Sequence, residues 1–166
     1  GRKLEDALED TTRLKELAPD DYAIRALHAT VLGDIGKHEE AEREHAFVKQ
    51  LGQESDDPNL QIRACLAPAV FASETLGDTE KARPLYEDCA RRNPTDIVTL
   101  NHIAGFFDGI GEQERSTEMI PKSVESAPES LALRGTLANR LQMAGDVEGA
   151  EQVLRESVDS FGSAQA

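Results

Sequence analysis

Histidine, cysteine and acidic side chains are the groups in this sequence whose chemistry could support a function. His28 and His45 lie eight residues before and nine residues after Gly36, and His38 lies between them. Neutral imidazoles on two neighbouring helices can bind zinc or respond to pH. Because no third ligand is evident, we expect two hydrogen-bonded, partly buried histidines, and neither a metal nor a cofactor.

The two cysteines, Cys65 and Cys89, could form a disulfide or remain as thiols. They are expected near the start of one helix and near the end of the antiparallel helix that follows, and these ends are neighbours in a helical hairpin. Spacing alone does not establish the Cα–Cα distance that a bridge needs, so we favour two small buried thiols. A bridge would indicate an oxidising compartment, periplasmic or secreted, and free thiols would allow a cytoplasmic one.

The acidic residues do not form a recognisable catalytic arrangement. The sequence contains no glycine-rich phosphate loop, no His-Glu-x-x-His and no Gly-x-Ser-x-Gly. Carboxylates such as Glu39, Glu40 and Glu42 are typical of the solvated outer face of a helix. We therefore expect no enzymatic activity within this segment.

The charge of the chain excludes further classes of partner. Its 166 residues carry a formal net charge of −14, which is spread evenly along the sequence. Binding to duplex nucleic acid or to an anionic membrane needs a concentrated basic face. The longest apolar run covers residues 64–72 and is interrupted by Pro68, so it is too short to span a bilayer. We expect a soluble chain that does not bind nucleic acid or insert into a membrane.

A repeat organises the whole sequence. Glycines occur at intervals of 41, 34 and 34 residues. Small residues recur five positions after each glycine, and small or nearly small ones recur seven positions before it. The glycines are Gly36, Gly77, Gly111 and Gly145. The residues five positions after them are Ala41, Ala82, Ser116 and Ala150, and those seven positions before them are Ala29, Val70, Ala104 and Ala138. A fixed period of this length is typical of a solenoid.

Each unit is predicted to consist of two amphipathic helices joined at the glycine. Glycine supplies the positive φ that a tight helix end requires. The small residues allow the two backbones to approach closely. Bulkier apolar residues fill the rest of the seam, four residues before the glycine (Leu32, Phe107, Leu141) and nine residues after it (Tyr86, Ile120, Leu154).

A 34-residue helix–turn–helix unit with these small residues and a terminal proline resembles the tetratricopeptide repeat family. The resemblance covers nearly the whole chain and implies an all-α, right-handed α-solenoid of antiparallel helix pairs. We expect a single domain with a first helix at residues 2–18 and repeats at about 22–55, 63–96, 97–130 and 131–164. The family's aromatic residue early in the first helix is missing, and Arg25, Leu66, Leu100 and Arg134 stand in its place.

Three irregularities modify this regular pattern. The first interval is seven residues longer than the others, and Asp57 followed by Pro58 is typical of an N-cap and a first-turn proline. We therefore expect the first helix of the second repeat to begin early and to be about two turns longer. Pro68, Pro84 and Pro121 should kink the helices that contain them. The array begins with half a unit and ends without a polar capping helix, so we expect a segment of a larger protein, or a terminal helix that packs against a neighbour.

The resemblance implies that the first helices of the repeats line a concave groove that binds peptides or partner helices. Residues ten and six positions before each glycine are expected to face this groove, together with their neighbours. Asn101 and Asn139 could hydrogen-bond an extended backbone, and Phe71 could contact an apolar side chain. The candidate groove residues are Thr30, Phe71, Glu74, Asn101, His102, Thr136, Asn139 and Gln142.

The predicted function is that of a protein-interaction scaffold. Relatives that bind acidic chaperone tails use lysine and arginine on the inner positions, which here contain neither, so a carboxylate clamp is not expected. A neutral, apolar or basic peptide or helix suits the groove better. Two alternatives remain: self-association through the ends of the solenoid, and a regulatory extension of an enzyme that lies outside this segment.

Overall fold

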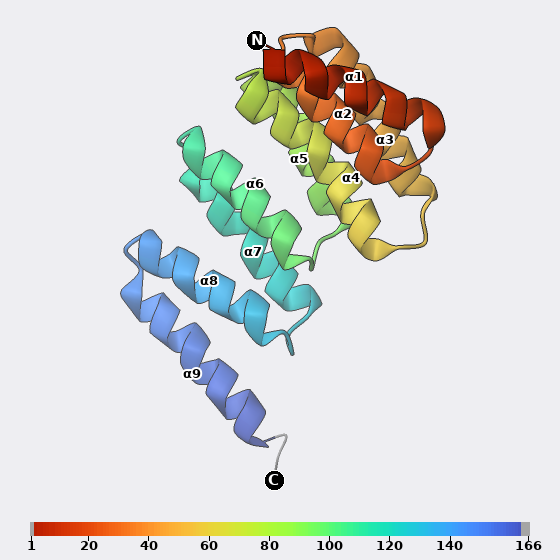
Figure 1. Cartoon of the computed structure of the whole chain (residues 1–166). Coiled ribbons are helices and arrows are strands. Elements are labelled where there is room, and N and C mark those ends of the chain that lie inside the picture. Colours follow the sequence, from red (N-terminus) through yellow and green to blue (C-terminus); the bar gives the residue numbers. More distant parts are fainter. Residues whose placement is uncertain (1, 164–166) are drawn as a thin grey trace. The chain divides into compact units, whose positions relative to one another are not determined.

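The computed structural model describes residues 2–163, and these residues form helices and no strand (Figure 1). The predicted all-α class is confirmed. The last residues, 164–166, which include the end of the fourth expected repeat, lie outside the described part. The helices are α1 (Arg2–Leu17), α2 (Tyr22–Asp34), α3 (His38–Glu54), α4 (Pro58–Val70), the π-helix η1 (Phe71–Thr75), α5 (Thr79–Arg92), α6 (Ile97–Gly109), α7 (Gln113–Ser126), α8 (Leu131–Met143) and α9 (Val147–Ser163).

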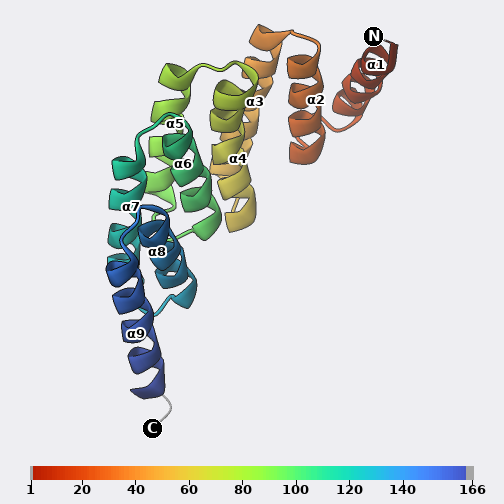
Figure 2. The ribbon, with the colours of Figure 1, turned by 90° about the vertical axis from the view of Figure 1, so that its left-hand side faces the viewer.

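The chain divides into two compact units, Gly1–Cys89 and Ala90–Ala166, with the boundary inside α5. In the first unit α1 contacts α2, α2 contacts α3, and α3 contacts α4. In the second unit each of the helices α6 to α9 contacts the next one along the chain, and α6 also contacts α8 (Figure 2). Consecutive helices are therefore packed neighbours within each unit.

The repeated glycines end the first helix of each pair as predicted. All four have positive φ, between 64° and 87°. At Gly36 the glycine N–H donates to the carbonyl of Gly33, and the N–H of Lys37 donates to the carbonyl of Leu32. Gly111 and Gly145 make the same two bonds in their own repeats. This paired arrangement satisfies carbonyls that the end of a helix leaves without partners.

The small residues around the glycines are buried at the helix crossings. The residues five positions after the glycine, Ala41, Ala82, Ser116 and Ala150, are all buried. Seven positions before it, Ala29, Ala104 and Ala138 are buried, but Val70 is only half-buried. The prediction is confirmed in the three regular repeats and fails in the second.

The π-helix η1 explains this exception. In the second repeat the N–H of Asp78 bonds to the carbonyl of Ala72, six residues back, whereas the equivalent bond at Gly36 spans five residues. One extra residue is therefore inserted ahead of Gly77. The insertion moves Ala69, which is fully buried, into the place expected for Val70.

The long first interval is also explained. Asp57 caps α4 by accepting a hydrogen bond from the N–H of Asn59, as expected from the Asp57-Pro58 pair. Together α4 and η1 have 18 residues, against 13 in each of the other first helices, α2, α6 and α8. The extension is about one and a half turns. α3 is also longer, with 17 residues where α5 and α7 have 14, whereas the connection from α3 to α4 is one residue shorter than those after α5 and α7.

The three internal prolines are accommodated within helices. α5 and α7 are continuous through Pro84 and Pro121. Pro68 lies near the end of α4, and the helix changes to the wider π geometry three residues later. Proline has no backbone N–H to donate, so Pro68 interrupts the regular α-helical hydrogen-bond pattern close to the point where η1 begins.

In two of the repeats an arginine stands at the position of the missing aromatic residue, and its side chain forms a hydrogen bond with the preceding loop. The Nε of Arg25 donates to the carbonyl of Pro19 at 2.6 Å, and the Nε of Arg134 donates to the carbonyl of Pro128 at 2.7 Å. Each bond ties the first helix to the loop that precedes it. Side-chain caps hold the same two loops, because Asp21 and Ser130 each accept a bond from a backbone N–H three residues later, and Asp96 does the same at the start of α6.

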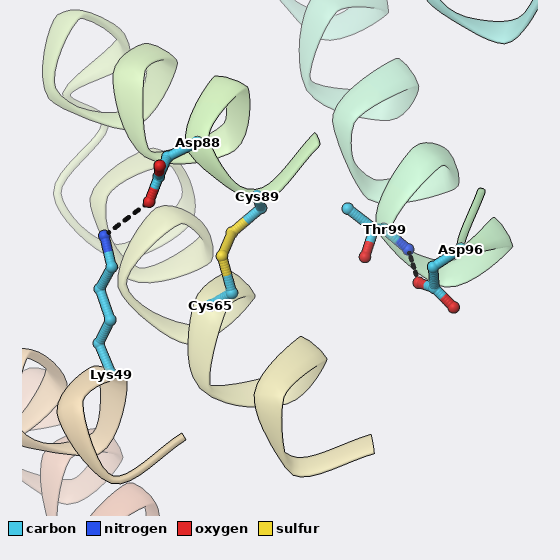
Figure 3. The surroundings of a disulfide bond; sticks show 6 residues. All are labelled: Lys49, Cys65, Asp88, Cys89, Asp96 and Thr99. Carbon is cyan, nitrogen blue, oxygen red and sulfur yellow. Dashed lines mark hydrogen bonds and ion pairs between the residues drawn. A yellow bond between two sulfur atoms is a disulfide. The ribbon is translucent and has the colours of Figure 1, made fainter. Parts of the chain in front are cut away.

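Cys65 and Cys89 form a disulfide between α4 and α5, which corrects the expectation of two free thiols (Figure 3). Their Cα atoms are 5.7 Å apart, within the range that a bridge requires. Both cysteines are buried. Beside the bridge, Lys49 of α3 reaches Asp88 of α5 at 3.2 Å. The sequence did not decide this point, because the crossing distance of two helices depends on their packing.

Enlarging the small residues at the crossings should destabilise the fold. Ala82→Leu and Ala150→Leu are each expected to cost about 2 kcal/mol, because both alanines are buried in close helix contacts. Ser126→Leu, at an exposed position at the end of α7, should cost much less. The midpoint of urea unfolding measures the effect. Equal midpoints for the three variants would contradict the proposed packing.

Candidate peptide-binding face

α6 and α8 present the most regular part of the expected groove. Each helix has 13 residues, begins after a side-chain cap and ends at a positive-φ glycine. The two helices contact each other within the second unit. Ile103 and Phe107 of α6 and Leu133 and Leu137 of α8 are buried. Because one face of each helix is fixed by this core, the opposite side chains have defined positions.

The exposed residues of these helices are uncharged, and they comprise polar side chains, glycines and the apolar residues Val98, Leu131, Ala132 and Met143. Asn101, His102, Asn139 and Gln142 are exposed, and Thr136 is half-buried. The Thr136 hydroxyl donates to the carbonyl of Ala132. We define the α6–α8 face as Asn101, His102, Gly105, Gly135, Thr136, Asn139 and Gln142.

Two glycines on this face make no close packing contact with the described residues. A Cβ atom built at Gly105 or at Gly135 would have no heavy atom of a described neighbour within 4 Å. A glycine inside a helix costs about 1 kcal/mol relative to alanine. At Gly33, by contrast, a Cβ atom would lie 2.8 Å from the Phe71 ring. The backbone of α6 and α8 is therefore accessible to another chain at Gly105 and Gly135.

The expected groove residues of the first unit are arranged differently. Thr30 on α2 and Glu74 on η1 are exposed, and these two elements contact each other. Phe71, however, is buried against the ring of His45, with the ring centroids 4.7 Å apart. The extra residue of η1 turns Phe71 into the core, so it cannot offer the apolar surface that we expected.

Two histidines of the first repeat, His28 and His45, are buried in its core. His28 is buried, and its Nδ1 lies 3.0 Å from the Thr11 hydroxyl. Burial lowers the pKa of His28, and it lowers the pKa of His45 to about 4. Among the residues that the structure describes, none forms a hydrogen bond with the Nδ1 of His45. Within the described residues no group of three or more histidine, cysteine or acidic side chains could hold a metal ion.

The low pKa of His45 predicts a loss of stability in acid. Unfolding would release a histidine of pKa 6.5 from a site where its pKa is about 4. The unfolded state therefore binds more protons as the pH falls from 6.5 towards 4, and about 2 kcal/mol should be lost by pH 5. Urea unfolding at pH 7 and pH 5 measures this loss.

A His45→Leu variant provides the control for the pH experiment, because leucine cannot titrate. Its stability should fall less between pH 7 and pH 5 than that of the parent chain, by about 2 kcal/mol. A parent-like pH dependence in His45→Leu would show that another group causes the loss.

A polar network at the ends of α6 and α8 was not anticipated from the sequence. Arg140 of α8 forms an ion pair with Asp108 of α6, and the Ser116 hydroxyl of α7 donates to the same carboxylate at 2.8 Å. These residues border a hollow of about 830 Å³, together with Gln113, Glu114, Glu118, Pro121, Met143 and Ala144. The spacing of Asp108 and Arg140, close to one repeat length, was the available signal for their contact.

No family model and no curated protein sequence matches this chain. Solved structures do resemble it. MamA (residues 41 to the end) from Desulfovibrio magneticus RS-1 has a TM-score of 0.54 and 16% identity, with 98% of this chain and 88% of that chain covered. BtubC from P. vanneervenii has a TM-score of 0.55 and 17% identity, with 95% and 70% covered.

A third similar structure is that of Naa15/Naa10 bound to HypK-THB. Its TM-score is 0.57 and its identity 15%, with 95% of this chain and 23% of that chain covered. Among residues 2–163 no helix has the length and apolarity needed to cross a membrane. The helix pairs, their glycine ends and these likenesses together show a tetratricopeptide-like α-solenoid fold.

Proposed function

We propose that this protein is an interaction scaffold whose α6–α8 face binds an extended peptide segment of a protein partner. The observation that carries the proposal is the combination of exposed carboxamides with the accessible glycines Gly105 and Gly135. A carboxamide offers both donors and an acceptor, which matches the hydrogen-bonding groups of a peptide backbone. Glycines without side-chain neighbours allow that backbone to approach the helices closely.

The charges support a neutral, apolar or basic peptide over an acidic one. The residues of the α6–α8 face include no lysine, arginine or acidic side chain. Arg140, at the end of the face, is already paired with Asp108. The net charge of −14 repels acidic segments at long range and attracts basic ones. The proposed mode of action is binding and presentation, without a covalent step.

The proposal is tested with a peptide selected from a random library against the whole chain. The double variant Asn101→Ala with Asn139→Ala should weaken its binding at least tenfold, because two backbone hydrogen bonds would be lost. The control is Gln50→Ala with Gln152→Ala, two exposed carboxamides on the second helices α3 and α9. Fluorescence anisotropy measures affinity, and circular dichroism checks helix content. Equal weakening in both double variants would place the binding site elsewhere.

Adding a methyl group at Gly135 should have opposite effects on the stability of the chain and on peptide binding. Gly135→Ala is expected to stabilise the chain by about 0.5–1 kcal/mol, because a Cβ atom there meets nothing and alanine favours the helix. The same methyl should weaken peptide binding, because it occupies the surface that the peptide backbone approaches. Urea unfolding and anisotropy measure the two effects. Tighter or unchanged peptide binding would contradict the proposed role of Gly135.

We infer that the chain functions in an oxidising compartment. The buried disulfide between Cys65 and Cys89 supports this inference, because such bridges persist where thiols are not kept reduced. Quantifying free thiols in protein taken directly from its native host, with alkylation at lysis, tests it. Fully alkylated cysteines in that material would contradict it.

A further inference from the structure

We propose that the outer face of α9 binds an amphipathic, basic helix of a partner protein. This α9 face consists of Val147, Leu154 and Val158, whose exposed fractions are 55%, 50% and 71%. Their spacing of seven and four residues places them along one side of the helix. The adjoining side of α9, with Ala150 and Ser157, is buried in the second unit, where α9 packs on α8. The exposed stripe therefore lies on a helix whose orientation is fixed.

The repeat shows that the position of Leu154 is normally covered. The residue nine positions after the glycine is His45 in α3, Tyr86 in α5 and Ile120 in α7. These three side chains are 7%, 2% and 1% exposed, whereas Leu154 is 50% exposed. The same chain thus buries an equivalent side chain three times and leaves it uncovered once. We attribute the difference to the neighbour that α9 lacks among the described residues.

The covering neighbour in the internal repeats is a helix. α3 is followed by α4 and α7 by α8, and each of these pairs is in contact. In the first case the neighbour of His45 is identified directly, because Phe71 packs against its ring. A helix placed on α9 as α4 is placed on α3 would cover Leu154. The packing of the internal repeats therefore indicates that the partner segment that covers Leu154 is a helix.

The charges of the internal pairs indicate the chemistry of that helix. The second helix α3 has five acidic and two basic residues, and the elements that cover it, α4 and η1, together have one arginine and one acidic residue, Glu74. α7 has three acidic and two basic residues, and its covering helix α8 has two arginines and no acidic residue. α9 follows the acidic pattern, with four acidic residues and one arginine. A neutral to basic helix is complementary to it.

A second copy of this chain fits less well than a basic partner. The other end of the array, α1, exposes Leu4, Leu14 and Leu17, but it carries five acidic and four basic residues. Each copy also has a net charge of −14, so two copies repel each other at low salt. The electrostatics therefore favour a partner that supplies positive charge.

The experiment uses the α8 sequence as a probe, because α8 already covers an equivalent helix. The probe is an amidated peptide of residues 130–145 that carries an uncharged fluorophore at its N-terminus, so that its two arginines give it a net charge of +2. We expect it to bind the whole chain, and the double variant Leu154→Gln with Val158→Gln to weaken binding at least tenfold. Glutamine keeps helix propensity and charge unchanged. The matched control is Leu4→Gln with Val98→Gln, which alters exposed apolar residues on α1 and α6.

The outcomes separate the possible occupants of the α9 face. Supporting results are saturable binding of the probe, loss of binding only in the α9 variant, and an affinity that falls severalfold between 50 and about 300 mM salt. A scrambled peptide of the same composition should not bind. No binding, or equal binding by the α9 variant, would overturn the proposal. So would self-association in sedimentation velocity that the α9 variant abolishes. The Asn101 and Asn139 variants test the α6–α8 face separately.

Discussion

Removing the disulfide is expected to destabilise the first unit by about 3 kcal/mol. Cys65 and Cys89 are 24 residues apart in the sequence, and a bridge across a loop of this length restricts the unfolded chain by about that free energy. The double variant Cys65→Ala with Cys89→Ala is appropriate because both side chains are buried and alanine adds no polar group. The midpoint of urea unfolding, followed by circular dichroism at 222 nm, measures the loss.

Reduction of the parent chain provides the control for this prediction. The parent chain unfolded in the presence of dithiothreitol should show nearly the stability of the double variant, because both lack the bridge. The variant itself should not respond to dithiothreitol. If the oxidised parent and the variant unfold at the same urea concentration, the bridge contributes nothing to stability and the account of the α4–α5 pair is wrong.

Replacing Gly52 by alanine is expected to cost about 3 kcal/mol. A Cβ atom at Gly52 of α3 would lie 2.2 Å from the Cβ atom of Ala64 on α4 and 3.3 Å from the carbonyl oxygen of Leu60. Neither neighbour is the end of a flexible side chain, so α3 and α4 would have to separate. The gain of about 1 kcal/mol in helix propensity is too small to offset this separation.

The control for Gly52 is the same substitution at an open position. Gly105→Ala, in the middle of α6, adds a methyl group that meets nothing within 4 Å. It should therefore stabilise the chain by about 0.5–1 kcal/mol. Urea unfolding of the two variants should show opposite signs. A stabilising effect of Gly52→Ala would mean that α3 and α4 do not cross closely at this point.

The regular repeats could be predicted from the sequence because glycine marks the end of each first helix. At Gly36, Gly111 and Gly145 the small residues five positions after and seven positions before the glycine are buried as predicted. Counting works there because helices of constant pitch convert sequence distance into direction. The N-cap at Asp57 was predicted for the same local reason. The bulkier residues follow the prediction less well, because Leu154, which was expected in the seam of the last repeat, is 50% exposed, and Leu141 is half-buried.

The second repeat could not be predicted in the same detail. The π-helix η1 inserts one residue between Ala72 and Gly77, which shifts every position counted back from that glycine. Nothing in the spacing distinguishes a π turn from an α turn, because the difference is a choice of hydrogen-bond partner. Phe71 was therefore assigned to the groove, whereas it packs in the core.

Side-chain partners were the least predictable part of the candidate site. The exposure of Asn101 and Asn139 follows from their distance to a glycine, and both are exposed as expected. The contact between Asp108 and Arg140 instead depends on the packing of α6 against α8, which the sequence does not specify. The same reasoning applies to the disulfide between Cys65 and Cys89.

The proposed binding role of the α6–α8 face is tested most directly by protection of an introduced thiol. Cysteine replaces Gln142, which is exposed on the face, or Glu125, which is exposed on α7, while the native cysteines remain bridged and buried. With a saturating library-selected peptide, maleimide labelling at position 142 should slow at least tenfold and labelling at position 125 should not change. Unchanged labelling at position 142, or protection at position 125 alone, would contradict the account.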